Sequence, residues 1–184
     1  MKPTQELSHE HEAILLMISI LEKMAEKLGA GQTVDVTHLE KAVDFIKIFA
    51  DKCHHGKEED LLFPAMEMAG IPKTGGPLGV MLQEHVAGRG FVKAMSEALA
   101  GVKKGDSRAA AIFAENARKY GALLSQHILK EDHILYPMAD ARLTAAQQSE
   151  LSACFADVEE KVIGHGRHEE YHRLLKELES EYLA

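Results

Sequence analysis

Histidine and glutamate recur together at two places in this chain, in a spacing suited to binding metal ions. An eleven-residue block begins at His54 and again, 73 positions later, at His127, and each copy carries a glutamate one helical turn further on, Glu58 and Glu131. Because residues i and i+4 project from the same face of a helix, about 6 Å apart along its axis, each pair can close on one metal cluster. The repeat predicts that two halves of the chain build one shared two-metal site.

A Glu-His pair precedes each block by about forty residues and adds one histidine per half, at His11 and His85. His9 is the alternative to His11, but the apolar stripe of its helix passes through position 11, and the match to the second pair favours it too. Buried histidines and carboxylates are costly unless they are bonded or coordinated, so matching sets in both halves favour coordination. The candidate metal ligands are His11, His54, Glu58, His85, His127 and Glu131.

His55 and Glu59 have the same spacing as His54 and Glu58 and compete with them for the ligand role. They lie one residue, about 100° of rotation, off the inward line of their helix. Position 55 corresponds to Ile128 in the second block, which has no ligand atom. The prediction therefore takes His54 and Glu58 as ligands, and expects replacement of Glu59 to leave the metal cluster intact.

Proline stands near the end of both blocks, at Pro64 and Pro137. Because proline lacks a backbone N–H, each is expected to kink or end its helix. Two interpretations stay open at this point: a simple helix terminator, and a bend that helps close the helices around the site.

Helical periodicity dominates the chain, without a convincing strand pattern. The first helix is expected over about residues 4–28, and the second opens with a capping box at Thr37. A loop over residues 70–77 precedes the third, and Asp106 caps the fourth. Four helices of similar length with short Gly- or Pro-rich connections favour an all-α, up-down-up-down four-helix bundle.

A second capping box, at Thr144, opens additional C-terminal helices. This segment is too short to build its own core, so it is expected to pack on the bundle. The predicted organisation is a metal-binding bundle over residues 1–142, with residues 143–184 as a helical extension of the same domain.

Composition narrows the function classes. The chain has 184 residues, 46% of them hydrophobic, and a net charge of −8, which argues against nucleic acid or an anionic membrane as partner. Without an apolar membrane span or signal peptide, a cytoplasmic location is expected. Cys53 and Cys154 cannot form a disulfide scaffold. A small buried hydrophobe is favoured over a redox-sensitive thiol at Cys53.

Taken together, these residues resemble the hemerythrin-like family, in its HHE cation-binding branch. The likeness covers about residues 4–141. The first and third helices each carry a Glu-His pair, and the second and fourth each carry the motif His-x3-Glu-Glu/Asp-x2-Leu-Phe/Tyr-Pro. The resemblance implies a helix bundle around two non-haem iron ions, with an oxo or hydroxo bridge, that interact with dioxygen, peroxide or nitric oxide. Carried over by position, the iron ligands are the six candidates named above.

One position departs from oxygen-carrying hemerythrins, which have a second histidine one turn after the ligand of the third helix. Arg89 stands there in this chain, one turn after His85, so the five-histidine set of the carriers is incomplete. Four histidines, two bridging carboxylates and a shared oxygen leave room for an exogenous ligand. This favours redox chemistry or sensing over reversible carriage. Arg89 itself can pair with a carboxylate near the site or lie in solvent.

The functional hypothesis is a di-iron protein that takes up O2, H2O2 or NO, for peroxide removal, gas or redox sensing, or iron supply. Peroxidase-like or catalase-like turnover stays open, and manganese or zinc in place of iron is not excluded. The alternatives are a non-catalytic metal store or sensor that signals through its C-terminal helices, and a reversible oxygen carrier. No feature identifies a protein partner, and a homodimer is one option.

Other combinations of histidine and glutamate are weaker candidates. The stretch from His168 to His172 matches the zinc-protease pattern His-Glu-x-x-His, but it lies in a strongly charged terminal helix. The ferritin-like pattern Glu-x-x-His begins at Glu6 and at Glu169, outside the internal repeat. For Glu159, at the edge of an apolar stripe, a surface carboxylate is favoured over an extra metal ligand.

Overall fold

The protein is described by a computed structural model that covers residues 1–164 and 166–184. All regular structure in these residues is helical, and no strand occurs among them, which confirms the all-α prediction. The sequence also predicts a break between two C-terminal helices at Gly164–Gly166, and residue 165 within it lies outside the described residues.

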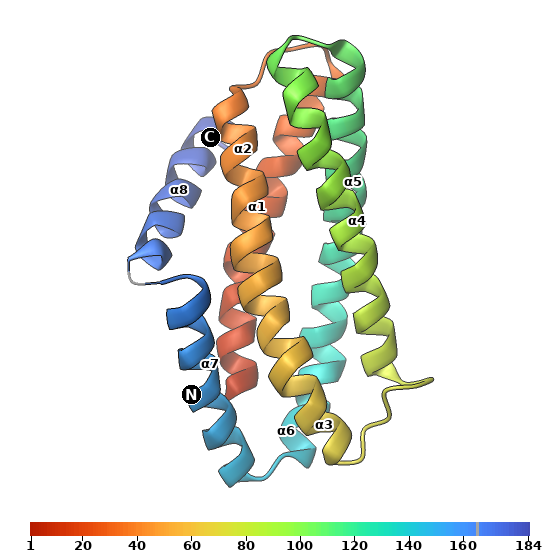
Figure 1. The fold of residues 1–184 in the computed structure, drawn as a ribbon, viewed down its shortest axis with the longest axis vertical. Helices are drawn as coiled ribbons and strands as arrows, with labels where there is room; N and C mark the ends of the chain where they lie inside the picture. The colour runs from red at the N-terminus through yellow and green to blue at the C-terminus, as the bar shows by residue number, and fades with distance from the viewer. Residues whose placement is uncertain (165) are drawn as a thin grey trace.

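Long helical stretches run side by side along the molecule (Figure 1). The first stretch is α1 (Pro3–Gly29) and the third is α4 (Pro77–Lys103). The second stretch consists of α2 (Val36–Phe45), η1 (Ile46–His55), η2 (Glu58–Leu62) and α3 (Phe63–Met68), where η marks a π-helix. The fourth stretch consists of α5 (Ser107–Lys130), η3 (Glu131–Leu135) and α6 (Tyr136–Arg142). Helix α5 packs against both α1 and α4, and α4 also packs against α2 and η1. The candidate ligands therefore come from stretches that are neighbours in space.

The helix caps agree with the sequence at two of three places. Asp106 accepts from the backbone N–H of Arg108 at 2.8 Å, and Thr144 begins a capping box, as predicted. The capping box predicted at Thr37 is wrong, because Asp35 caps α2 by accepting from the backbone N–H of Thr37 at 2.8 Å. A carboxylate at Asp35 meets the unpaired N–H groups of the first turn directly.

Wide turns interrupt the two helical stretches that carry the repeated blocks. Segment η1 ends at His55, whereas η2 and η3 begin at the two glutamates, Glu58 and Glu131. The backbone N–H of Phe63 bonds the carbonyl oxygen of Glu58, five residues back, and that of Tyr136 bonds Glu131 in the same way. Such π-type turns are frequent at functional sites, and here both halves place one at the same point.

The two prolines follow these wide turns and do not end their helices. Pro64 and Pro137 lie at the second position of α3 and α6, which continue to Met68 and Arg142. Proline is tolerated in the first turn of an α-helix, where its missing N–H would have no partner. The sequence interpretation as helix terminators is therefore wrong.

The buried apolar side chains form two clusters separated along the helices. On α1, Leu7 belongs to one cluster and Ile14 to the other, with His11 between them. On α4, Met81 and Val92 lie on either side of the other Glu-His pair in the same way. The candidate ligands thus form a buried polar layer between two apolar layers, which keep water away from it.

Two further helices, α7 (Ala145–Val162) and α8 (Arg167–Tyr182), lie against one side of the molecule (Figure 1). Helix α8 packs on α1 and α2, and α7 packs on α1, η1 and η2. Phe155 of α7 belongs to one apolar cluster and Leu178 of α8 to the other. The extension therefore shares both clusters with the rest of the chain. Among the described helices, none has the length and apolar character needed to cross a membrane.

Replacement of Phe155 by alanine tests whether the extension and the bundle unfold together. Phe155 is fully buried, and removing a buried phenyl group costs about 3–5 kcal/mol. We expect Phe155→Ala to lower the stability of the whole chain in urea by that amount, in one transition. Leu129→Ala, at a side chain that is 48% exposed, is the control. Separate transitions for the two parts would contradict the shared core.

Candidate metal centre

The four candidate histidines lie in two pairs in the middle of the polar layer. In the first pair, the Nε2 atoms of His11 and His54 are 3.1 Å apart. In the second pair, those of His85 and His127 are 3.0 Å apart. All four side chains are buried. The structure thus brings the four histidines together, and it leaves the competing His9 exposed.

The two candidate glutamates lie between the histidine pairs. Glu131 Oε2 is 3.2 Å from His11 Nε2, and its Oε1 is 2.9 Å from His127 Nε2. Glu58 Oε2 is 3.4 Å from His85 Nε2 and 3.9 Å from His54 Nε2. Each carboxylate therefore faces one histidine of each pair.

The inner oxygens of these glutamates lack ordinary hydrogen bonds. Among the described residues, Glu58 Oε2 and both carboxylate oxygens of Glu131 have no hydrogen-bond partner of normal geometry, although both side chains are fully buried. Buried carboxylate oxygens normally have partners. Oxygens of this kind facing imidazole nitrogens are a donor set that fits Fe, Mn or Zn ions. The residues present therefore fit bound metal ions.

An outer carboxylate orients each of the four imidazole rings. Because an ionised carboxylate can only accept, the Nδ1 atom of each ring is the donor. The outer acceptors are Asp132 for His11 at 2.9 Å, Glu10 for His54 at 2.8 Å, Glu59 for His85 at 2.6 Å and Glu84 for His127 at 2.8 Å. With Nδ1 protonated, the Nε2 lone pair of each neutral ring points inward, where it can bind a metal.

Basic side chains hold the outer carboxylates in turn. Lys57 donates to Glu10 at 2.6 Å, and Lys130, at the same offset in the second block, donates to Glu84. Arg89 lies 2.8 Å from Glu59, so the solvated alternative for Arg89 is excluded. Charged partners of this kind keep the outer carboxylates ionised and fixed.

Lys57 is fully buried and links the centre to the C-terminal extension. Its Nζ donates to Glu159 of α7 at 2.6 Å and to Glu6 of α1 at 3.0 Å, in addition to Glu10. These three carboxylates surround the ammonium group of Lys57, so the chain itself supplies the cation with which they pair. Glu159 therefore acts as a partner of Lys57.

The sequence comparisons agree with this geometry. The family model "Hemerythrin HHE cation binding domain" matches residues 2–139. The chain belongs to this family. Its buried histidine and glutamate groups can hold metal ions.

The curated proteins that match this chain are longer than it is, and their names state no function. Uncharacterized proteins of Mycobacterium tuberculosis and Mycobacterium bovis are each 22% identical over 160 residues, covering 87% of this chain. The matched part is 62% of those proteins, so the chain spans less than two thirds of their length.

Several residues of this hemerythrin-like site were not assigned a role from the sequence. The sequence placed Glu59 off the inward line of its helix and gave it no role as a ligand, whereas the structure shows it accepting a hydrogen bond from His85 Nδ1. The internal repeat carried the missing signal: Glu59 and Asp132 are both acidic at one offset, and Lys57 and Lys130 are identical at another. Ligand spacing alone does not identify such supports, because they orient the ligands without facing the metal.

The aromatic residue before each proline also belongs to the site. Phe63 stacks on His85, with ring centroids 6.0 Å apart, and Tyr136 stacks on His11 at 5.5 Å. Only Tyr136 carries a hydroxyl, which donates to Glu58 Oε1 at 2.9 Å. The two halves therefore place one aromatic ring each on equivalent histidines, but only one half adds a hydrogen bond to a central glutamate.

His55 lies inside the hemerythrin-like site, contrary to its predicted outward position. Its ring stacks on His85 with a centroid distance of 3.9 Å, and it groups with Glu58, His85 and His127 as a possible ligand. The sequence argument assumed the rotation of an α-helix, whereas His55 ends the π-helical segment η1, in which successive residues are rotated less. Both adjacent histidines are therefore buried.

Burial and hydrogen bonding shift the pKa values of these imidazoles in opposite directions. Burial opposes protonation of His11, but its hydrogen bond to Asp132 and the nearby Glu131 carboxylate outweigh burial and raise its pKa to about 9. The same balance at His85 raises its pKa to about 9. For His55, burial and the nearby charge of His85 lower the pKa to about 3. His55 is therefore neutral at pH 7.

Among the described residues, the remaining sequence candidates join neither of the two central groups of ligand atoms. In the described residues, His168 and His172 join no group of three ligand atoms, and their ring centroids are 6.3 Å apart. Cys53 is buried, and burial raises the pKa of its thiol to about 12. A protonated, enclosed thiol agrees with a packing role rather than redox reactivity.

Replacement of Glu59 by glutamine is expected to weaken metal binding by 10- to 100-fold, the usual effect of losing a carboxylate that orients a ligand histidine. The change removes the charge that His85 and Arg89 share. Metal affinity measured by chelator competition is the test. Asp60→Asn, at the exposed neighbouring position, is the matched control. Equal affinities for Glu59→Gln and wild type would rule out this role.

Proposed function

We propose that the centre binds two iron ions and uses them to interact with O2, H2O2 or NO. The observation that carries the proposal is the pair of buried glutamates without hydrogen-bond partners, each between the two histidine pairs. His11 and His54 would hold one metal, and His85 and His127 the other. Glu58 and Glu131 would join the two. When bound, the irons would supply the electrons and the open positions for a small oxidising or diatomic ligand.

The mixture of neutral nitrogen and anionic oxygen donors fits iron, manganese or zinc, and the resemblance to the hemerythrin-like family favours iron among them. With Glu58 and Glu131 shared, the donors leave positions for an exogenous ligand. His55, adjacent to the second pair, is a further nitrogen donor for that metal. With His55 included, five histidines surround the centre, so the donor set is compatible with redox chemistry, with sensing and with reversible oxygen carriage.

The surrounding residues of the chain prepare the site in three ways. The outer carboxylates fix the ring orientation of the ligand histidines, so little reorganisation is needed when metal binds. Tyr136 holds one oxygen of Glu58 by its hydrogen bond, which leaves the other oxygen facing the histidines. The apolar layers on both sides limit the entry of water and strengthen the electrostatic interactions within.

The proposed architecture around the site is the up-down-up-down four-helix bundle, supported by the packing of α1 and α4 on α5 and of α2 on α4. A cytoplasmic location is proposed with it, supported by two cysteines that are both free, as is usual in a reducing compartment.

A second candidate function is a non-catalytic metal sensor that signals through the C-terminal helices. One observation favours it: Glu159 of α7 contacts Lys57, which contacts Glu10, which contacts His54. A change at the first metal would thereby reach the extension. Turnover of peroxide by the iron-loaded protein above the level of free iron would favour the redox function over this one.

Metal analysis of the purified protein, combined with its visible spectrum before and after O2, peroxide and NO, tests the proposal. We expect two irons per chain, absorption bands of an oxo bridge, and spectral change with at least one ligand. A single zinc ion per chain would refute the di-iron proposal.

Alanine variants of the two central glutamates give the matching internal test. Because Glu58 and Glu131 occupy equivalent places, Glu58→Ala and Glu131→Ala should each reduce the iron content to a similar degree. Glu67→Ala, at an exposed position of α3, should retain two irons. Full occupancy in either central variant would contradict the bridging role.

Metal affinity is expected to rise with pH between 7 and 9. The pKa values of His11 and His85 are raised to about 9 in the metal-free chain, whereas metal ligands must be deprotonated. Each histidine therefore releases a proton on binding below pH 9, and affinity gains about tenfold per pH unit for each proton released. Chelator competition at a series of pH values measures this slope. A flat profile would contradict it.

A further inference from the structure

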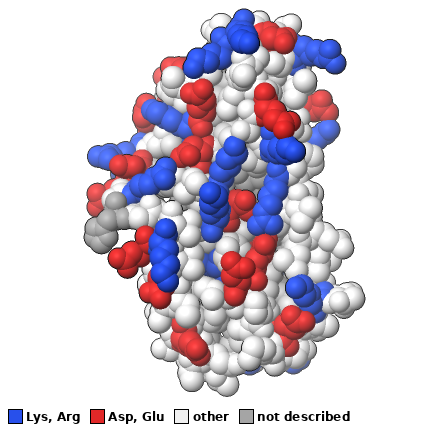
Figure 2. Space-filling view, viewed as in Figure 1, with Lys and Arg blue, Asp and Glu red and all other residues white. Residues whose placement is uncertain are grey.

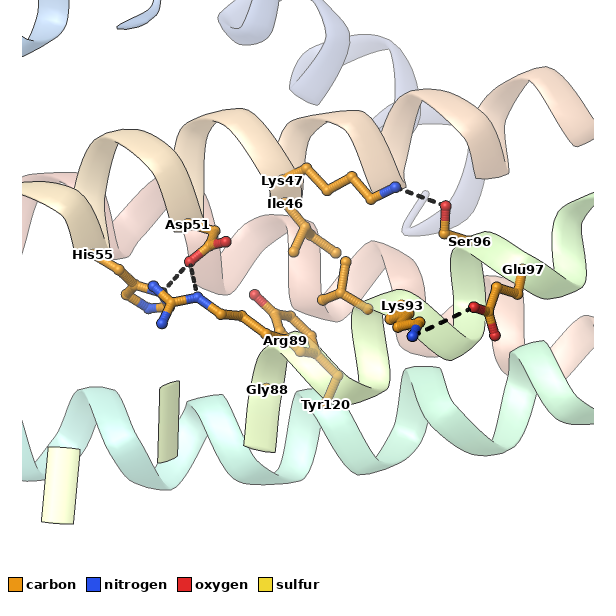
Figure 3. Close-up of a pocket in the computed structure, with 11 residues that line it drawn as sticks. Ile46, Lys47, Asp51, His55, Gly88, Arg89, Lys93, Ser96, Glu97 and Tyr120 are labelled. Carbon is orange, nitrogen blue, oxygen red and sulfur yellow. Dashed lines mark hydrogen bonds and ion pairs between the residues drawn. The ribbon is translucent and has the colours of Figure 1, made fainter. Parts of the chain in front are cut away.

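A pocket of about 340 Å³ opens between η1, α4 and α5, beside the second histidine pair. Figure 3 shows it, with Asp51 and His55 on η1, Arg89 on α4 and Tyr120 on α5. Ile46, Val92 and the ring of Tyr120 give it a mainly apolar wall. A concave, apolar pocket of this size with a few polar groups is typical of small-molecule sites.

The internal repeat shows that the residues of η1 and α4 that line this pocket differ from their counterparts on α5 and α1. By the offsets that align the ligands, Gly88 of α4 corresponds to Ile14 of α1, and Asp51 and His55 of η1 correspond to Leu124 and Ile128 of α5. Those three counterparts are all buried apolar side chains. Where α1 and α5 carry large aliphatic groups, α4 has a glycine and η1 has two polar side chains. The departures from the repeat coincide with the pocket.

Tyr120 provides a polar group inside the pocket that lacks a partner. Its side chain is buried, and among the residues that the structure describes its hydroxyl makes no hydrogen bond. Figure 3 shows the ring beside Arg89, with the hydroxyl pointing from α5 toward η1. A buried hydroxyl without a partner costs free energy, and an acceptor oxygen on a bound molecule would remove that cost.

The rim of the pocket carries a positive charge. Lys47 donates to the hydroxyl of Ser96 at 2.7 Å, and within the described part of the chain it forms no ion pair. Arg89 is already paired with Asp51, whereas Lys93 lies 3.9 Å from Glu97. Figure 2 shows basic side chains over the middle of this face. The rim is therefore suited to an anionic group on a molecule whose body lies inside.

The inner end of the pocket reaches the candidate metal centre through His55. This histidine lines the pocket, and its ring stacks on His85 at a centroid distance of 3.9 Å. A molecule in the pocket would contact His55 without displacing any of the six candidate ligands.

We propose that this pocket binds a small aromatic carboxylate that carries, besides the carboxylate group, a second oxygen substituent on its ring. Its ring would lie against Ile46 and Val92, its second oxygen would accept a hydrogen bond from Tyr120, and its carboxylate would lie near Lys47. The site goes beyond the proposed di-iron function, because none of these contacts depends on which metal is bound.

Calorimetric titration of the full-length, metal-loaded protein with 4-hydroxybenzoate tests the proposal. We expect saturable binding to one site. Benzoate, which lacks the second oxygen, and 4-hydroxybenzamide, which lacks the charge, should each bind more weakly. Repeating the titration after chelator treatment separates this site from the metal proposal, since binding at the pocket should persist when the metal is removed.

Variants locate the contacts. Tyr120→Phe should weaken 4-hydroxybenzoate about five- to tenfold, the usual value of one hydrogen bond, and leave benzoate unchanged. Lys47→Gln should weaken it and reduce the salt dependence of binding. Lys41→Gln, at an exposed lysine of α2, is the matched control and should bind as wild type does.

Filling the pocket should abolish binding. Gly88→Ile introduces the residue of the other half, and a Cβ atom at Gly88 would lie 3.4 Å from Leu124 and 3.7 Å from Tyr120. Ser96→Phe, at a half-buried position on the rim, fills the pocket from the other side if the first variant folds poorly. Absence of saturable binding in wild type, or unchanged binding in a folded variant with a filled pocket, would overturn the proposal. If Tyr120→Phe weakened the binding of benzoate as much as that of 4-hydroxybenzoate, the assigned hydrogen bond between Tyr120 and the second oxygen would be wrong.

Discussion

The structure depends on satisfying a layer of ionisable groups buried between two apolar clusters. Four histidines and two glutamates at the centre would be strongly unfavourable there if each stood alone. The chain meets this requirement in successive layers: central glutamates face histidines, histidines donate to outer carboxylates, and lysine or arginine side chains neutralise those carboxylates. What the inner oxygens lack within the described chain is a partner that bound cations would provide.

The internal repeat explains why so many residues of each block recur. Each half supplies two ligand histidines, a central glutamate, two outer carboxylates, a lysine and a stacked aromatic ring in equivalent places. The contacts cross between helices: Glu10 of α1 orients His54 of η1, and Asp132 of η3 orients His11 of α1. The layer therefore ties neighbouring helices to one another as well as holding the ligands.

Differences between the halves are as informative as the repeat. The first pair has the hydroxyl of Tyr136 near it and a buried lysine that contacts the C-terminal extension. The second pair has His55 and an adjacent pocket. Two metals bound in such surroundings would differ in hydrogen bonding, in access and in their connection to the rest of the chain.

The sequence by itself predicted the helical class, the repeat and the set of six candidate ligands, because the i, i+4 spacing and the match between the two blocks indicate which side chains can share a site. It also excluded a second histidine after His85. Only the tertiary structure decided that Glu59 hydrogen-bonds with His85, that Lys57 pairs with Glu159 and that the side chain of His55 is buried. These outcomes depend on distances between helices and on the wider turn of η1. A pattern based on the α-helical period contains neither quantity.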